Sequence, residues 1–113
     1  MDNSESKTVM TFHKKFRQYD LGKGHPFRGD RFGNAIRFFE GQSLLSLPQM
    51  MIVEPRPASK EDLLRVHEEG YVDLIFRSAE TGKPYDFETP VSPEILEAVL
   101  LIVGGAIECG QAI

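Results

Sequence analysis

The pattern of apolar and polar positions predicts two short strands. Residues 8–12 read Thr-Val-Met-Thr-Phe, and residues 50–53 read Met-Met-Ile-Val, followed by Pro55 and Pro57. Short runs rich in apolar and β-branched residues, closed by proline, are typical of strands. We therefore expect a strand in each of these two segments.

Helical spacing follows both strand candidates. Phe32, Ile36 and Phe39 fall at positions i, i+4 and i+7 behind Asp30, which can cap a helix that ends near Gly41. After the second strand, residues 59–62 read Ser-Lys-Glu-Asp, the spacing of a capping box. We expect a helix there that breaks at Gly70, and another helix from residue 71 to residue 79.

The last predicted helix is apolar around most of its circumference. Ser92 can cap it, with proline and glutamate in its first turn. Its polar residues share one narrow stripe: Glu94, Glu97, Glu108 and Gln111. Such a helix has to be covered on several sides, and Gly104-Gly105 permits another backbone to come close.

The order of strands and helices predicts an α/β fold built on parallel strands. Two strands and about four helices cannot bury the last helix, so we expect residues 8–113 to be the first part of a larger domain, truncated within or just after a helix. Residues 1–7 are polar and are expected to form a disordered leader.

Composition narrows the functional classes. The chain has 113 residues, 41% of them hydrophobic, and a net charge of −4, which argues for one folded domain and against direct nucleic-acid binding. The single cysteine, Cys109, excludes an internal disulfide and favours a reducing compartment. The longest apolar run, residues 98–103, is too short to span a bilayer, and no signal peptide is present, so we expect a cytoplasmic protein.

Residues 19–31 carry the richest candidate chemistry. The segment contains glycines and a proline that exclude regular structure, together with cations, a histidine and aromatic rings. Its three cations are Lys23, Arg28 and Arg31. From chemistry alone, they are equally consistent with a carboxylate or phosphate site and with a solvated loop.

Metal and nucleophile signals are weak. A site made from His13, His25 and Asp30 can be drawn, but no motif fixes its geometry. His67 is better explained as a helix histidine near the core, and Cys109 has no visible base. From the residue types and spacings alone, we therefore assign no catalytic or metal-binding role.

Four segments form an ordered set of motifs: Gly24-His25-Pro26-Phe27-Arg28-Gly29-Asp30-Arg31, Pro57-Ala58-Ser59-Lys60-Glu61-Asp62-Leu63 leading to His67 and Tyr71, Glu88-Thr89-Pro90-Val91, and Gly104-Gly105-Ala106. Taken in this order, they resemble the N-terminal part of the zinc-dependent histone deacetylase family, including its acetoin-utilization relatives. The resemblance covers residues 8–113. It implies the N-terminal portion of a three-layer parallel-sheet, arginase-like deacetylase fold that is incomplete in this chain.

The resemblance also implies roles for residues of the first loop. Arg31 would face an inner channel lined by His25, Pro26 and Phe27, where a fixed guanidinium could escort released acetate. Glu88 would bind the substrate backbone at the rim. The family usually has aspartate there, so the longer side chain moves the carboxylate outward.

The chemistry implied is zinc-dependent removal of acetyl groups from acetylated lysine, polyamines or small amides. The family's zinc ligands and catalytic residues match positions beyond residue 113. We therefore expect this chain alone to hold no zinc ligands and to be inactive. One alternative is a non-catalytic remnant that associates with a separately encoded C-terminal portion, and another is a small anion-binding domain that uses the three loop cations.

Overall fold

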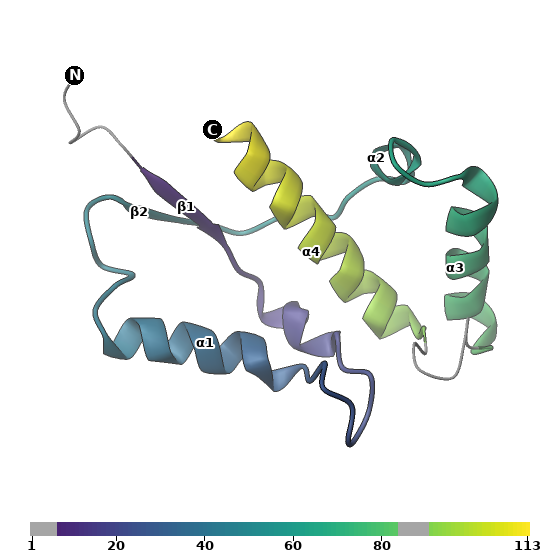
Figure 1. Cartoon of the computed structure of the whole chain (residues 1–113), viewed down its shortest axis with the longest axis horizontal. Coiled ribbons are helices and arrows are strands. Elements are labelled where there is room, and N and C mark those ends of the chain that lie inside the picture. Colours follow the sequence, from purple (N-terminus) through teal and green to yellow (C-terminus); the bar gives the residue numbers. More distant parts are fainter. Residues whose placement is uncertain (1–6, 84–90) are drawn as a thin grey trace.

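The structure, a computed structural model, describes residues 7–83 and 91–113. The elements in this part of the chain are β1 (Thr8–Thr11), the 3-10 helix η2 (Lys14–Gln18), α1 (Asp30–Gly41), β2 (Met50–Val53), α2 (Lys60–Leu64), α3 (Glu69–Thr81) and α4 (Pro93–Gln111). Both predicted strands and the predicted long last helix are confirmed (Figure 1). The short helix η2 had no predicted counterpart.

The two strands pair in parallel, as the order of elements predicted. Thr8 lies opposite Met50, and the register continues to Thr11 opposite Val53. Helix α1 belongs to the connection between them, the strand–helix–strand unit that parallel pairing requires. The described residues therefore form a small parallel sheet with helices attached.

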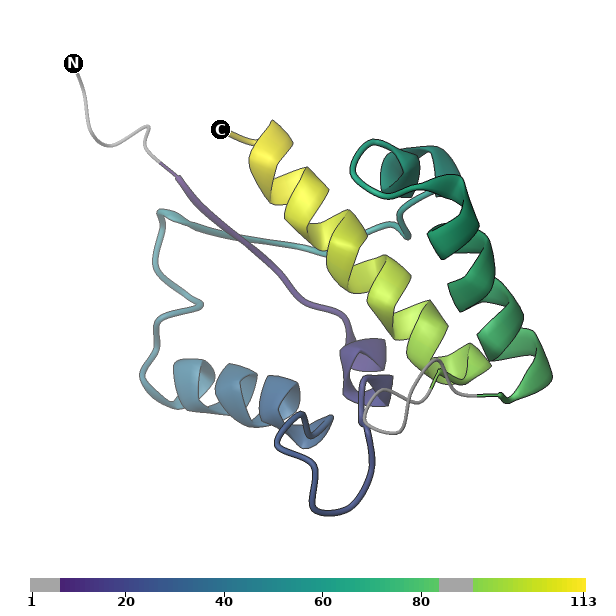
Figure 2. The same ribbon diagram turned by 45° about the vertical axis from the view of Figure 1, so that its right-hand side comes forward.

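Helix α4 is the element around which the others are arranged. It contacts η2, β1 and α3 (Figures 1 and 2), and it contributes the buried Ile95, Ala98 and Leu101. Its glycine pair lies where other segments cross it. The N–H of Ala58 donates to the carbonyl oxygen of Leu100 at 2.8 Å, which confirms the expected close backbone approach.

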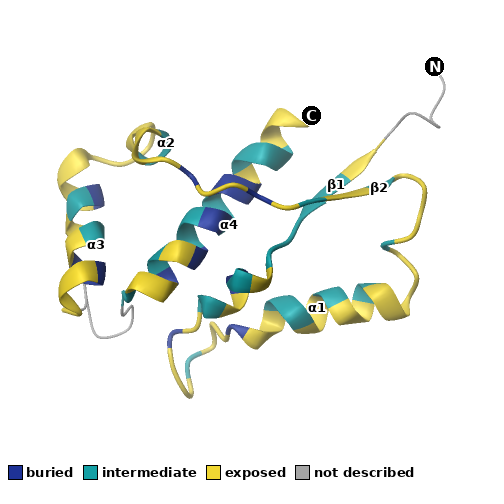
Figure 3. Ribbon diagram, turned by 180° about the vertical axis from the view of Figure 1, so that it is seen from behind, coloured by how far each residue is buried: buried dark blue, intermediate teal, exposed yellow. Residues whose placement is uncertain are grey.

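Helix α1 is packed differently, because none of its residues is buried. Figure 3 shows it mostly exposed, in contrast to the buried centre of α4. Phe38 on this helix is 62% exposed. The predicted apolar positions Phe32, Ile36 and Phe39 are half-buried, so in the described part of the chain α1 is only partly covered.

Three local expectations were wrong. Gly29 rather than Asp30 is the N-cap residue of α1, and no side chain bonds to that cap. Gly70 does not break a helix, because α2 already ends at Leu64 and α3 begins at Glu69. His67 is exposed and lies between these two helices, rather than within a helix near the core.

The capping box at the start of α2 is present as predicted. The Ser59 hydroxyl accepts the Asp62 N–H at 3.1 Å, and the Asp62 carboxylate accepts the Ser59 N–H at 2.9 Å. These bonds lower the pKa of the Asp62 carboxyl.

Within the described residues, no helix is long and apolar enough to cross a membrane.

Candidate functional site

The loop that joins η2 to α1 forms a closed turn. The N–H of Leu21 donates to the Phe27 carbonyl at 3.2 Å across its neck, and the N–H of His25 donates to Gly22 at 3.1 Å. Gly22 and Gly24 have φ of +110° and +86°, a region that side chains disfavour. The glycines of this segment therefore give the loop its shape.

Asp20 bonds to both ends of the loop. One carboxylate oxygen accepts the N–H of Gly22 and the other accepts the N–H of Gly29, each at 3.0 Å. Both bonds lower the pKa of the Asp20 carboxyl, and the bond from Gly29 has the larger effect. Sequence reasoning missed Asp20. The signal that could have found it is an aspartate two residues before a glycine, the spacing of an Asx turn.

Arg31 lies among aromatic rings. Its guanidinium carbon is 4.8 Å from the centre of the Phe32 ring and 5.2 Å from that of Phe27. The Tyr19 ring is 5.9 Å away and stacks on Phe27 at an interplanar angle of 29°. Such positions over aromatic faces favour a cation.

The loop cations differ in their partners. Arg28 forms a salt bridge with Asp30. Among the described residues, no carboxylate lies within salt-bridge distance of Arg31. A hollow of about 410 Å³ is lined by Asp20, Gly22, Lys23, Gly24, His25 and Arg28, but not by Arg31. The three cations proposed as one anion site are therefore not gathered around one cavity.

His25 and Phe27, two residues of the predicted inner channel, pack on each other. The Nδ1 atom of His25 accepts the Phe27 N–H at 3.1 Å, and the ring centres are 5.4 Å apart. Phe27 is 44% exposed, and Pro26 is also exposed. The loop thus brings Phe27 next to both His25 and Arg31, and the lining of a channel by these residues stays a prediction.

The histidines do not form a metal site. The Nε2 atom of His13 lies 3.3 Å from Glu54, and its Nδ1 accepts the Lys15 N–H. The His67 ring packs against Tyr71. Among residues 7–83 and 91–113, no group of three or more histidine, cysteine, aspartate or glutamate side chains could hold a metal ion. The candidate set of His13, His25 and Asp30 is therefore not brought together as a metal site in the described part of the chain.

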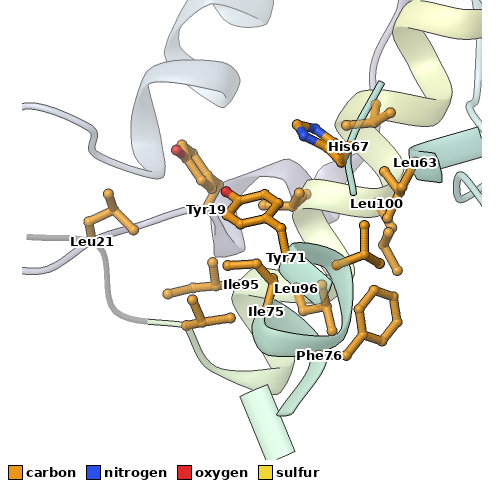
Figure 4. A pocket seen from close by; sticks show the side chains of 14 residues that line it. Tyr19, Leu21, Leu63, His67, Tyr71, Ile75, Phe76, Ile95, Leu96 and Leu100 are labelled. Atoms are coloured by element: carbon orange, nitrogen blue, oxygen red, sulfur yellow. The ribbon is translucent and has the colours of Figure 1, made fainter. Parts of the chain in front are cut away.

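A second hollow, which the sequence did not predict, lies between α3 and α4. Its volume is about 240 Å³ and its lining is mainly apolar. Tyr19, Leu21, His67 and Tyr71 contribute to the lining, together with side chains from both helices (Figure 4). Tyr19 thus belongs both to the lining of this hollow and to the ring cluster at Arg31.

Glu88, the predicted substrate-binding residue, lies outside the described residues.

Comparison with known proteins gives a consistent result. Residues 25–113 match the histone deacetylase domain model. A protein named "Probable deacetylase" from Archaeoglobus fulgidus is 29% identical over 106 residues, which are 94% of this chain and 30% of that protein. The acetoin utilization protein AcuC of Staphylococcus aureus (strain MSSA476) is 30% identical over 122 residues, covering 100% of this chain and 31% of AcuC.

The structural comparison agrees on the fold. The crystal structure of the HDA15 HD domain superposes with a TM-score of 0.73 at 19% identity, covering 91% of this chain and 30% of that one. The predicted fold class is therefore confirmed, and the described elements are part of that larger fold. This chain spans about 30% of the length of these relatives.

Proposed function

Because residues 25–113 match the histone deacetylase domain, the chain belongs to that family, and we propose that it supplies the inner-channel loop of an amide hydrolase. The reaction is removal of acetyl groups from acetylated lysine, polyamines or small amides. In this proposal Arg31, Phe27, His25 and Pro26 line the channel, and Glu88 binds the substrate backbone. The protein acts in the cytoplasm in this proposal and binds neither nucleic acid nor membrane directly.

The observation that supports this proposal is the environment of Arg31. Its guanidinium lies near three aromatic rings, and no carboxylate among the described residues neutralises it. Deacetylation produces acetate, a small anion. A cation held in place by rings keeps its donors for such an anion, and guanidinium matches the geometry of a carboxylate.

Among the residues of this chain that the structure describes, no group of three or more histidine, cysteine, aspartate or glutamate side chains could hold a zinc ion. The hydrolytic step is therefore assigned to none of the described residues, and we propose that the isolated chain is inactive. A fluorogenic acetyl-lysine assay of the purified chain with added zinc tests this. Turnover above the enzyme-free blank would contradict it.

The role of Arg31 can be tested in a chimera in which this chain replaces the matching first part of the Archaeoglobus fulgidus relative. We expect the chimera to deacetylate an acetyl-lysine peptide and the Arg31→Ala chimera to lose most of that activity. Arg37→Ala is the matched control, because Arg37 is an exposed arginine of the same helix that bonds to Asn34. A folded but inactive parent chimera, or an Arg31→Ala chimera as active as its parent, would contradict the proposal.

A second role is supported by the incomplete burial of α1 and β2. None of the residues of α1 is buried, and Phe38 on that helix and Met51 and Ile52 on β2 are exposed. This role is association with a polypeptide that carries the remaining portion of a deacetylase domain. Co-expression with the C-terminal part of the same relative, followed by affinity purification, tests it. A 1:1 complex is expected, and a monomer of this chain beside an unbound partner would contradict it.

A further inference from the structure

We propose that Asp20 is a positioning residue for Arg31. Its carboxylate fixes the two ends of the loop and thereby sets where the guanidinium lies relative to the aromatic rings. The importance of that position for deacetylation rests on the function proposed above. The positioning itself can be measured without any activity.

The first argument is the span of the two hydrogen bonds. Opposite oxygens of Asp20 accept from Gly22 and Gly29, which lie two and nine residues further along the chain. Gly29 is the N-cap residue of α1. The carboxylate therefore holds the beginning of the loop directly against the beginning of the helix.

The second argument is the tight packing at Gly29. A Cβ atom there would lie 1.8 Å from the carbonyl oxygen of Arg17, so the backbone of the loop touches η2 at this point. Gly29 is also buried. Its N–H needs an acceptor where water has little access, and Asp20 provides one.

The third argument is where Tyr19 and Arg31 lie along the chain. Tyr19 directly precedes Asp20, and Arg31 follows Gly29 by two residues. The bond from Gly29 to Asp20 therefore holds together the two chain segments that carry the ring and the cation. In the described chain, the backbone bond from Leu21 to Phe27 closes the neck of the loop but ends two residues before Gly29, the N-cap residue of α1.

Two-dimensional NMR of the 113-residue chain tests this proposal. We expect the Arg31 side-chain protons to be shifted upfield by the nearby rings, and the Gly22 and Gly29 amide protons to be shifted downfield by the carboxylate. In Asp20→Ala the Arg31 ring-current shift should be largely lost. In Asp20→Asn, which keeps an acceptor oxygen, it should be intermediate, while resonances of α3 and α4 stay in place.

Lys23→Ala is the matched control, because Lys23 lines the same hollow without bonding across the neck. It should leave the Arg31 resonances unchanged. An unshifted Arg31 in the wild-type chain, or an Arg31 shift preserved in Asp20→Ala, would overturn the proposal. Loss of spectral dispersion throughout both Asp20 variants would also overturn it, because a positioning role is local to the loop. None of these outcomes depends on the Arg31→Ala chimera, so the two proposals fail separately.

Discussion

A Cβ atom on Gly104 would lie 1.8 Å from the carbonyl oxygen of Arg56. The chain segment before α2 therefore crosses α4 with its backbone in direct contact with the helix. This crossing brings the N–H of Ala58 to the carbonyl oxygen of Leu100 at 2.8 Å. The absence of a side chain at position 104 is what allows α4 to lie so close to the segment that follows β2.

Substitution Gly104→Ala should be strongly destabilising. The added methyl would meet backbone rather than a flexible side chain, so α4 and the crossing segment have to separate. We expect a loss of about 3 kcal/mol or more in the free energy of unfolding, at the upper end of overpacking effects. Urea unfolding followed by circular dichroism measures it.

Gly110→Ala is the control for this prediction. Gly110 is near the end of the same helix, and nothing lies within 4 Å of a Cβ atom built there. This variant should be neutral or more stable by up to about 1 kcal/mol, because alanine favours helix more than glycine does. Equal stability changes at positions 104 and 110 would show that the crossing does not constrain the helix.

The Asp20 carboxyl should titrate below its ordinary pKa of 3.8. Hydrogen bonds from Gly29 and Gly22 favour its charged form in the folded chain. Its contribution to stability is therefore present above the unfolded-state pKa and is lost as the pH falls through the lower folded-state pKa. The Gly29 amide shift, followed from pH 6 downward, should have a midpoint below 3.8. A midpoint at or above that value would show that the Asp20 carboxylate does not accept these two hydrogen bonds in the folded chain.

Removing the side-chain N-cap of α4 should lower the free energy of unfolding of the chain. The Ser92 hydroxyl accepts the Ile95 N–H at 3.1 Å, and Ser92→Ala removes that acceptor. We expect a loss of about 1 kcal/mol in thermal or urea unfolding. Ser46→Ala is the control, since Ser46 is exposed and outside any helix, and it should change stability by no more than about 0.5 kcal/mol.

Tyr19 should contribute to activity through its ring rather than its hydroxyl. In the chimera described above, Tyr19→Leu removes one aromatic face from Arg31, an interaction of about 0.5–1 kcal/mol. We expect about a two- to fivefold lower kcat/KM for acetyl-lysine peptide. Tyr19→Phe should retain the parent value. A larger loss in Tyr19→Phe than in Tyr19→Leu would assign the effect to the hydroxyl.

The sequence predicts best those features that are set by neighbouring residues. The capping box depends on Ser59 and Asp62 alone, and it is present as expected. The predicted cap of α1 was wrong although its competitor is also close in sequence. The Asp30 carboxylate is engaged by Arg28, two residues before it, while the Gly29 N–H is taken by Asp20, nine residues before it.

The same distinction applies to the candidate site. Composition selected residues 19–31 as the candidate functional loop, and the resemblance selected Arg31 as its candidate channel residue. The ring cluster around Arg31 depends on the path of the loop, which returns Phe27 to Tyr19. The separation of Arg31 from the hollow of Lys23 and Arg28 depends on that path as well. No residue pattern specifies either arrangement.

The described fold measures 51 by 32 by 17 Å. It is thin along its shortest axis, and within it no residue of α1 is buried, whereas α4 contributes several buried residues. Solvent therefore reaches the sheet and α1 readily, whereas the centre of α4 has the most protection. Amide protons in the middle of α4 should consequently exchange with deuterium more slowly than those of β1, β2 and α1.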